Sequence, residues 1–137
     1  MISDLDVLLR SLEPVLHDGV YVYTSVPPGG ALPDCVAMVR EAEGVTLILP
    51  EADALRLGLP VLFRAAWITL TVHSDLQAVG LTAAVAAALT DAGISCNVVA
   101  GAYHDHLFVP FERGGDAMCS LTDLHVGNPQ TKGLSRG

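Results

Sequence analysis

The first half of the chain shows short apolar runs punctuated by proline and glycine, which is typical of small strands with few helices. The pattern predicts a leading helix, three strands and a short helix, at residues 4–12, 20–26, 36–40, 45–49 and 51–57. We expect the leading helix to end near Leu12, because Pro14 disfavours helical geometry in the residue before it. A last turn can continue to His17.

The second half begins with a strand and then carries the clearest helix pattern of the chain. The elements predicted here are a strand, a polar loop, a helix, two strands and a second helix, at residues 67–72, 73–80, 81–92, 94–99, 106–109 and 114–122. In the helix over 81–92 the apolar residues form one stripe, and Gly93 is the expected C-cap. A closing strand is expected at residues 124–126.

The two halves look like an internal repeat. "VTLILPEADAL" and "DHLFVPFERGGDAM" share a strand, a proline, an acidic residue and a helix, and "VYVYTSV" corresponds to "WITLTVHS". Ser25 and Pro50 are 25 positions apart, whereas Ser74 and Pro110 are 36 apart. The difference is about three helical turns. The first half therefore lacks the helix between its first two strands, and we infer that the leading helix fills the equivalent place on its sheet.

This order of elements favours an α+β fold of two ferredoxin-like βαββαβ modules in tandem, with antiparallel sheets and helices on one face. We expect a first module of atypical order at 1–64, a second module at 65–128 and a flexible tail at 129–137. If the halves pair edge to edge, each hides an open strand of the other.

Composition excludes several classes of partner. The net charge is −8 and the seven basic residues are scattered, so we expect neither a nucleic acid nor a membrane surface as partner. No apolar run approaches the ~20 residues that span a bilayer, and the N-terminus does not resemble a signal peptide. Three cysteines without a CxxC pattern indicate the reducing cytoplasm.

The stretch "WITLTVHSDLQAVGLTAAVAAALTDAGISCNVVAGAYHDHLFVP", residues 67–110, resembles an ACT domain. The specific features are the loop that ends in Val79-Gly80-Leu81, the helix, the strand with Asn97 and the YHDH hairpin. In architecture the whole chain is similar to small standalone bacterial proteins built from two ACT modules, although the first half departs from the usual order. The resemblance implies a regulatory module that binds small molecules, most often amino acids.

In ACT modules the ligand lies where the loop after the first strand meets the neighbouring module. Carried over to this sequence, the resemblance implies ligand contacts from His73, Ser74, Asp75, Val79, Gly80, Leu81, Asn97 and Val98. The local chemistry agrees, because free N–H groups at a helix start attract a carboxylate, Asp75 suits an ammonium group, and Asn97 offers both a donor and an acceptor. The residues alone also allow structural roles: a turn for Gly80, a cap for Asp75 and an internal hydrogen bond for Asn97.

His104, Asp105 and His106 lie in register with Gly44, Val45 and Thr46 of the first half, and so at a hairpin bend and strand start. The two histidines would share one face of an extended strand and Asp105 the other. We expect a structural role, or else a contribution to the ligand pocket. A closed zinc site needs four ligands and no second pair has suitable spacing, so we expect no metal. The sequence shows no GxSxG and no activated nucleophile pattern, so we expect no catalytic residue. We expect no cofactor either.

The sequence thus predicts a non-enzymatic amino-acid-binding regulatory module that forms a homo-oligomer. The alternative is an oligomerisation or protein-interaction scaffold without a ligand. A third hypothesis, an enzyme that works through His104, Asp105 and His106, requires turnover or a bound metal.

Overall fold

Strand β5 (Phe63–Val72) organises the sheet, because it has paired neighbours on both of its edges. The computed structural model describes residues 9–72 and 79–126. In these residues the sheet has seven strands in the order β3-β4-β2-β5-β7-β6, with β1 also paired to β5, and all pairs are antiparallel. The other elements are β1 (Leu12–Leu16), β2 (Tyr21–Val26), β3 (Ala37–Arg40), β4 (Val45–Pro50), α2 (Glu51–Arg56), α3 (Val79–Asp91), β6 (Asn97–Ala100), β7 (Asp105–Pro110), η1 (Phe111–Arg113) and α4 (Gly114–Val126).

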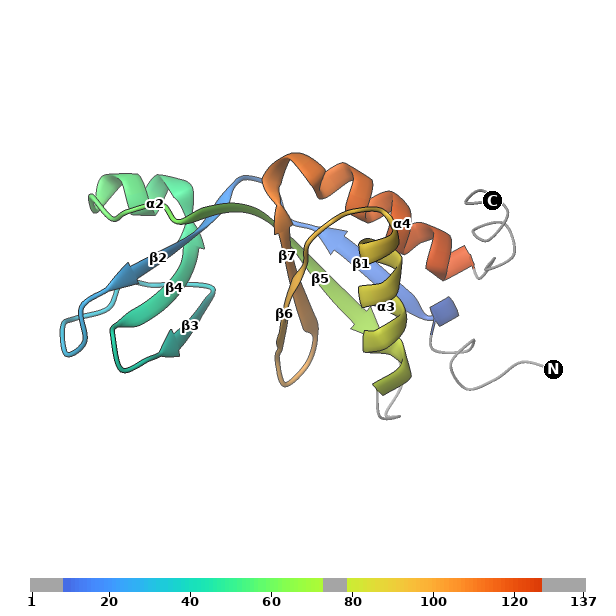
Figure 1. Ribbon diagram of the computed structural model, residues 1–137, viewed down its shortest axis with the longest axis horizontal. Coiled ribbons are helices and arrows are strands. Elements are labelled where there is room, and N and C mark those ends of the chain that lie inside the picture. The colour runs from blue at the N-terminus through green and yellow to red at the C-terminus, as the bar shows by residue number, and fades with distance from the viewer. Residues whose placement is uncertain (1–8, 73–78, 127–137) are drawn as a thin grey trace.

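The first module consists of β2, β3, β4, α2 and the beginning of β5, and forms one lobe (Figure 1). Its core lies beneath α2 and is built from Val22, Val45, Leu47, Leu49 and Ala54. Residues 27–36 form turns and coil, so the predicted absence of a helix between the first two strands is confirmed. Leu32 and Cys35 of this segment are partly buried and pack against the core.

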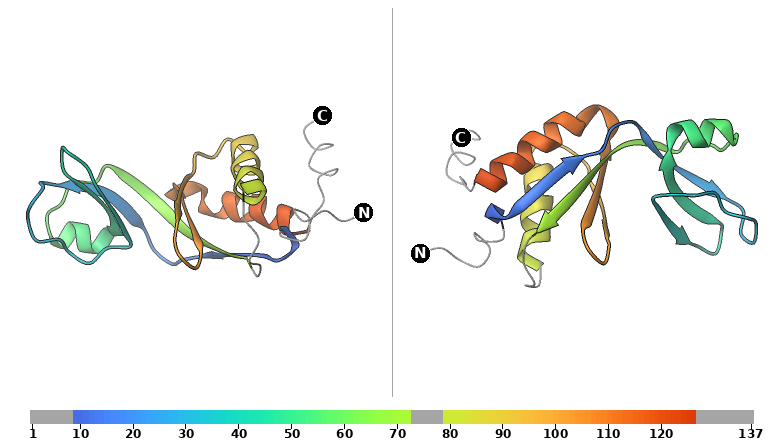
Figure 2. Two further views of the ribbon diagram at one scale, coloured as in Figure 1. Left: turned by 90° about the horizontal axis from the view of Figure 1, so that it is seen from below. Right: turned by 180° about the vertical axis from the view of Figure 1, so that it is seen from behind.

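The second module places its strands in the order β1-β5-β7-β6, with α3 and α4 on one face (Figure 2). Strand β1 closes this sheet, and Leu12, which has no exposed surface, belongs to its core. The predicted closing strand at residues 124–126 is wrong, because β1 already occupies that edge of β5 and α4 continues to Val126. The predicted fold, two ferredoxin-like modules with antiparallel strands, is confirmed.

The leading segment does not fill the gap in the first module. Residues 9–10 are helical, but Leu9 packs on the second module's core. The expectation that the leading helix covers the first sheet is therefore wrong for the described residues. A helical turn that continues to His17 is also wrong, because the peptide N–H of His17 donates to the carbonyl of Trp67 and extends the ladder of β1.

The internal repeat is clear in the two hairpins. Strands β4 and β7 both end in proline and both lead directly into a helical segment. The turns before them are equivalent: the N–H of Glu41 donates to the carbonyl of Gly44, and that of Gly101 to the carbonyl of His104, both at 2.9 Å. The predicted register, with His104 in the place of Gly44, is thus confirmed.

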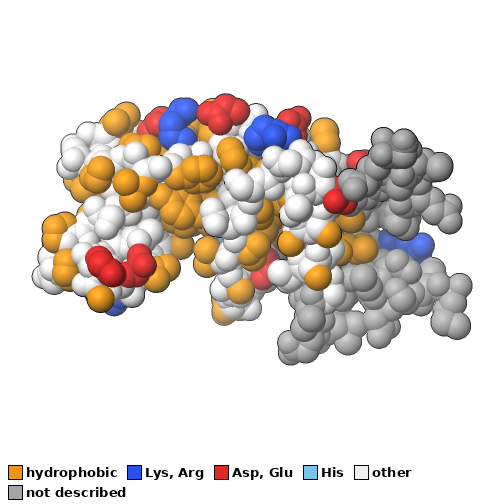
Figure 3. Space-filling view, viewed as in Figure 1, with side chains coloured by type: hydrophobic (Ala, Val, Ile, Leu, Met, Phe, Trp, Pro, Cys, Tyr) orange, Lys and Arg blue, Asp and Glu red, His pale blue; other side chains and the backbone are white. Residues whose placement is uncertain are grey.

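The two modules share a third core where their lobes meet. Ile48, Ala65 and Phe108 are buried there, and Tyr23 contacts the Phe108 ring edge-on with centroids 6.0 Å apart. Hydrophobic side chains are visible at this junction in Figure 3. The predicted boundary between residues 64 and 65 falls inside β5, and the predicted residue limits of the modules and the tail stay a prediction.

The predicted starts of two strands are wrong, one too late and the other too early. Strand β5 begins at Phe63, four residues before the predicted start, because residues 63–65 pair with β2. Strand β6 begins at Asn97, because Ile94 is buried in the second core as the chain leaves α3. Among the described residues, no helix is long and apolar enough to cross a membrane.

Because Leu12 joins a buried core from a strand distant in sequence, Leu12→Ala is expected to lower the free energy of unfolding by about 2–5 kcal/mol. Val15→Ala on the same strand is the matched control. Its side chain is 53% exposed, so we expect a change within about 0.5 kcal/mol. Urea denaturation measures both, and equal effects would contradict the role of β1 as the closing strand.

Candidate functional site

The beginning of α3 is where the resemblance places the ligand, and part of it is described. Gly80 is exposed, whereas Leu81 is buried in the second core. His73, Ser74 and Asp75 lie outside the described residues, as does the side chain of Val79. The ligand contacts predicted for this segment therefore stay a prediction.

The described residues beneath α3 are closely packed. They enclose a cavity of about 10 Å³, lined by Leu70, Leu81, Thr82, Val85, Val98, Asp105 and Leu107. This space is barely large enough for one water molecule. The described residues therefore leave no room for a ligand beneath α3.

Asn97 and Val98 point to opposite sides of the sheet, because successive residues of a strand alternate. Val98 lines the small cavity beside Leu81. Asn97 instead lies beside the first module, next to Tyr23. Burial raises the pKa of the Tyr23 hydroxyl, and the nearby Asn97 side chain opposes the increase. Asn97 thus connects the two modules and is separated by the sheet from Leu81.

The histidines of the YHDH stretch line the second module's open face, which we define as Thr69, Thr71, His104 and His106 on the side away from α3 and α4. His104 Nδ1 lies 3.2 Å from the hydroxyl of Thr71, and His106 Nδ1 lies 3.2 Å from that of Thr69. Asp105 faces the opposite side and lines the cavity beneath α3. The predicted alternation of the three side chains agrees with this arrangement.

Two further residues, His17 and Trp67, join the open face and were not identified from the sequence. The His17 ring stacks on the Trp67 indole, with centroids 3.6 Å apart, and its Nε2 lies 2.7 Å from the hydroxyl of Thr69. Trp67 Nε1 donates to His106 Nδ1 at 3.1 Å. No sequence pattern indicates this cluster, because His17 is isolated in sequence. It reaches Trp67 through the pairing of β1 with β5.

The cluster favours neutral imidazoles. His106 Nδ1 must be unprotonated to accept the indole N–H. Burial lowers the pKa of His17, the nearby His106 lowers it further, and Asp18 acts in the opposite direction. Burial likewise lowers the pKa of His106, the nearby His104 lowers it further, and Asp105 acts in the opposite direction. Among the described side chains, no three His, Cys, Asp or Glu residues are placed to hold a metal ion.

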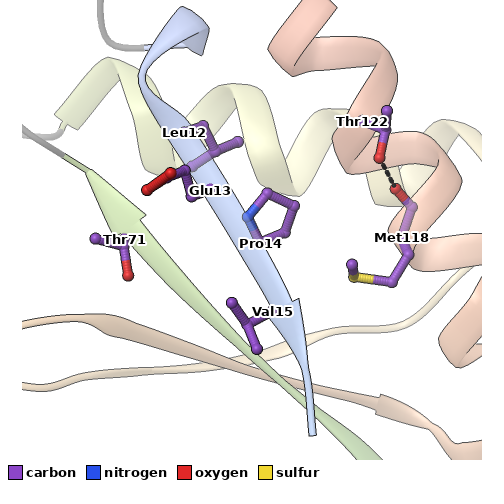
Figure 4. A pocket seen from close by; sticks show the side chains of 7 residues that line it. All are labelled: Leu12, Glu13, Pro14, Val15, Thr71, Met118 and Thr122. Atoms are coloured by element: carbon purple, nitrogen blue, oxygen red, sulfur yellow. Dashed lines mark hydrogen bonds between the residues drawn. The ribbon is translucent and has the colours of Figure 1, made fainter.

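A second, larger groove of about 480 Å³ runs along β1 beside α4 (Figure 4). It is lined by Leu12, Glu13, Pro14, Val15, Thr71, Met118 and Thr122. The hydroxyl of Thr122 donates to the backbone carbonyl of Met118 at 2.8 Å, so it is already satisfied. Pro14 has no N–H to offer to an added strand. The groove therefore follows the outer edge of β1, where Pro14 disfavours the pairing of another strand.

The histidine cluster predicts a pH-dependent stability. Both folded-state pKa values lie below the ordinary value of 6.5. The stabilisation is therefore complete above pH 6.5 and is lost as the pH falls through the folded-state values, because the unfolded chain binds protons first. Urea denaturation between about pH 5 and about pH 8 measures this. His17→Gln combined with His106→Gln should flatten the profile, and an unchanged slope would contradict the assignment.

Comparisons with known proteins support the repeat. Models of the ACT domain match residues 2–66 and residues 63–123. No curated protein sequence matches the chain.

Several solved structures resemble the protein, and three of them illustrate the range. The first is a Vibrio cholerae protein of unknown function, described as a possible transport protein, with 44% identity, a TM-score of 0.81 and coverage of 90% of this chain and 98% of that chain. The second is a putative C-terminal regulatory domain of aspartate kinase from Porphyromonas gingivalis, with 14% identity, a TM-score of 0.57 and coverage of 82% and 95%. The third is Escherichia coli aspartokinase III in complex with aspartate and ADP, with 14% identity, a TM-score of 0.59 and coverage of 85% and 33%.

The last two comparisons concern the fold alone. ACT domains are generally regulatory modules that bind ligands. Both halves match the ACT models, and the sheet repeats one plan twice about β5. The chain therefore belongs to the ACT-domain family and consists of two ACT modules in tandem.

Proposed function

We propose that this protein is a non-enzymatic regulatory module that binds an amino acid and passes the signal on through assembly. The observation that carries the proposal is that the two ACT matches together cover residues 2–123. The resemblance to the regulatory domain of aspartate kinase, and to an aspartokinase solved with aspartate, supports an amino acid as the ligand. The three unpaired cysteines support a cytoplasmic location.

The proposed site lies over the first turn of α3. The N–H groups in the first turn of a helix have no partner within the helix, and together with the helix dipole they favour a carboxylate, by about 0.3–1 kcal/mol from the dipole. Gly80 is exposed and has no side chain, so a ligand can approach the backbone. His73, Ser74 and Asp75 are the proposed polar contacts, with Asp75 for the ammonium group. Val98 is the proposed contact from β6, since Asn97 faces the first module.

Thermal unfolding in the presence of each common amino acid tests the proposal. A ligand at 100 times its Kd should stabilise the protein by about 2.7 kcal/mol, which corresponds to a rise in Tm of several degrees. Asp75→Ala should remove the shift, because it deletes the proposed partner of the ammonium group. Asp34→Ala, an exposed carboxylate of the first module, is the control and should keep it. A Tm that no amino acid changes would overturn the proposal.

A second candidate function is an assembly scaffold without a ligand. The observation in its favour is a group of exposed apolar side chains on α2 and the connection to β5. Leu55, Leu57, Val61 and Leu62 are between 40% and 66% exposed. Exposed apolar groups of this kind mark interaction surfaces when they form one patch.

Sedimentation analysis distinguishes this candidate from the first. If this surface joins two copies, Leu55→Glu combined with Leu62→Glu should weaken self-association by at least about tenfold, because each buried charge costs more than about 1.4 kcal/mol. Val15→Glu, at an equally exposed apolar position of the other lobe, should leave it unchanged. If the protein is a scaffold without a ligand, added amino acids should change neither the sedimentation mass of the assembly nor its Tm.

A further inference from the structure

A hollow of about 220 Å³ lies between the two modules, and the amino-acid site proposed above does not use it. One wall comes from β2, β3 and β4 of the first module and the other from β6 of the second. The lining residues are Tyr23, Ala37, Met38, Val39, Thr46, Ile48, Asn97 and Val99. Several of them belong to the core that the modules share, so the hollow is continuous with the junction of the two lobes.

The side chains that line the hollow are mostly apolar, with polar groups at one end. Among the described residues, no Asp, Glu, Lys or Arg side chain lines the hollow, which disfavours a charged ligand because the charge would be desolvated without a partner. The hydroxyl of Thr46 already donates to Glu41 at 2.6 Å. The neighbouring side chains of Tyr23 and Asn97 remain as the polar groups that a ligand can bind. Together the two side chains offer hydroxyl and amide groups, both donors and acceptors.

The rim of the hollow leaves apolar surface in contact with water. Val39 is 58% exposed and Met38 is 38% exposed, although both line the hollow. In the part of the chain that the structure describes, β3 pairs only with β4 and β6 only with β7, so no further described strand covers them. A molecule that occupies the hollow would remove this apolar surface from water and contact both modules at once.

The volume restricts the ligand to one ring. An apolar cavity of about 150 Å³ accepts benzene, so the hollow has room for a single aromatic ring with a short substituent. We propose that the hollow is a second ligand site, for a neutral monocyclic aromatic molecule with one hydrogen-bonding group. The ring lies against Ile48 and Val99, and the polar group engages Tyr23 and Asn97. This site is independent of the amino-acid site, because Gly80, Leu81 and Val98 are not part of its lining.

The test is an NMR titration of the backbone amides with benzyl alcohol, with benzoate and benzylamine as charged analogues of similar size. The expected result is saturable shifts of the amides in β3 and β6. The charged analogues should bind at least about tenfold more weakly, because the lining offers no counter-charge. Absence of saturable shifts with benzyl alcohol, or shifts confined to α3, would overturn the proposal.

Three variants make the test specific. Ala37→Leu fills the hollow and should weaken binding about tenfold or more. Asn97→Ala removes one hydrogen bond and should weaken it about three- to tenfold. Ser95→Ala changes an exposed polar residue just before β6 that is not part of the lining, and should leave binding unchanged. If Ala37→Leu does not fold, the comparison of Asn97→Ala with Ser95→Ala decides, and equal effects of these two would refute the site.

Discussion

The structure depends on the pairing of one strand, β5, with both modules. One edge of β5 pairs with β2 at residues 63–65 and with β1 at residues 68–72, while the other edge pairs with β7 at residues 65–70. In the first module β5 lies beside β2, and in the second module β1 lies beside β5. Strand β5 is therefore part of both four-stranded sheets. Ala65 and Ala66 lie at the crossing, where one is buried in the shared core and the other in the second core. Arg64 adds ion pairs to Glu51 of α2 and Glu112 of η1, and so joins the two helical junctions at the surface.

The functional features follow from this pairing. Because β1 lies beside β5, His17 stacks on Trp67 and completes a cluster of histidines that neither segment could form alone. Because the two sheets join through β5, Tyr23 meets Phe108 and Asn97, which leaves the hollow between β3 and β6. The start of α3, in contrast, is held by its own module through Leu81 and Val85. The first proposed ligand position therefore lies within a module and the second lies between the modules.

The sequence predicts the local features well. The glycine at the end of α3, Gly93, has a positive φ of 72°, and the prolines that end β4 and β7 mark the repeat, because each acts on its own neighbours. The errors are non-local. Leu12 follows a helical pattern, yet it is drawn into a strand by partners that lie far along the chain, and this occupies the edge predicted for residues 124–126. Which of Asn97 and Val98 faces the first module depends on the exact register of β6 with β7, which periodicity alone does not fix.

Native-state hydrogen exchange tests most directly whether β5 makes the two modules one cooperative unit. If it does, the amides of residues 63–65 and those of residues 68–72 exchange only through the same global opening, with equal free energies and equal dependence on denaturant. If residues 63–65 exchange together with β2 and β4 at a clearly lower free energy than residues 68–72, the modules unfold separately and the account of a shared strand is wrong.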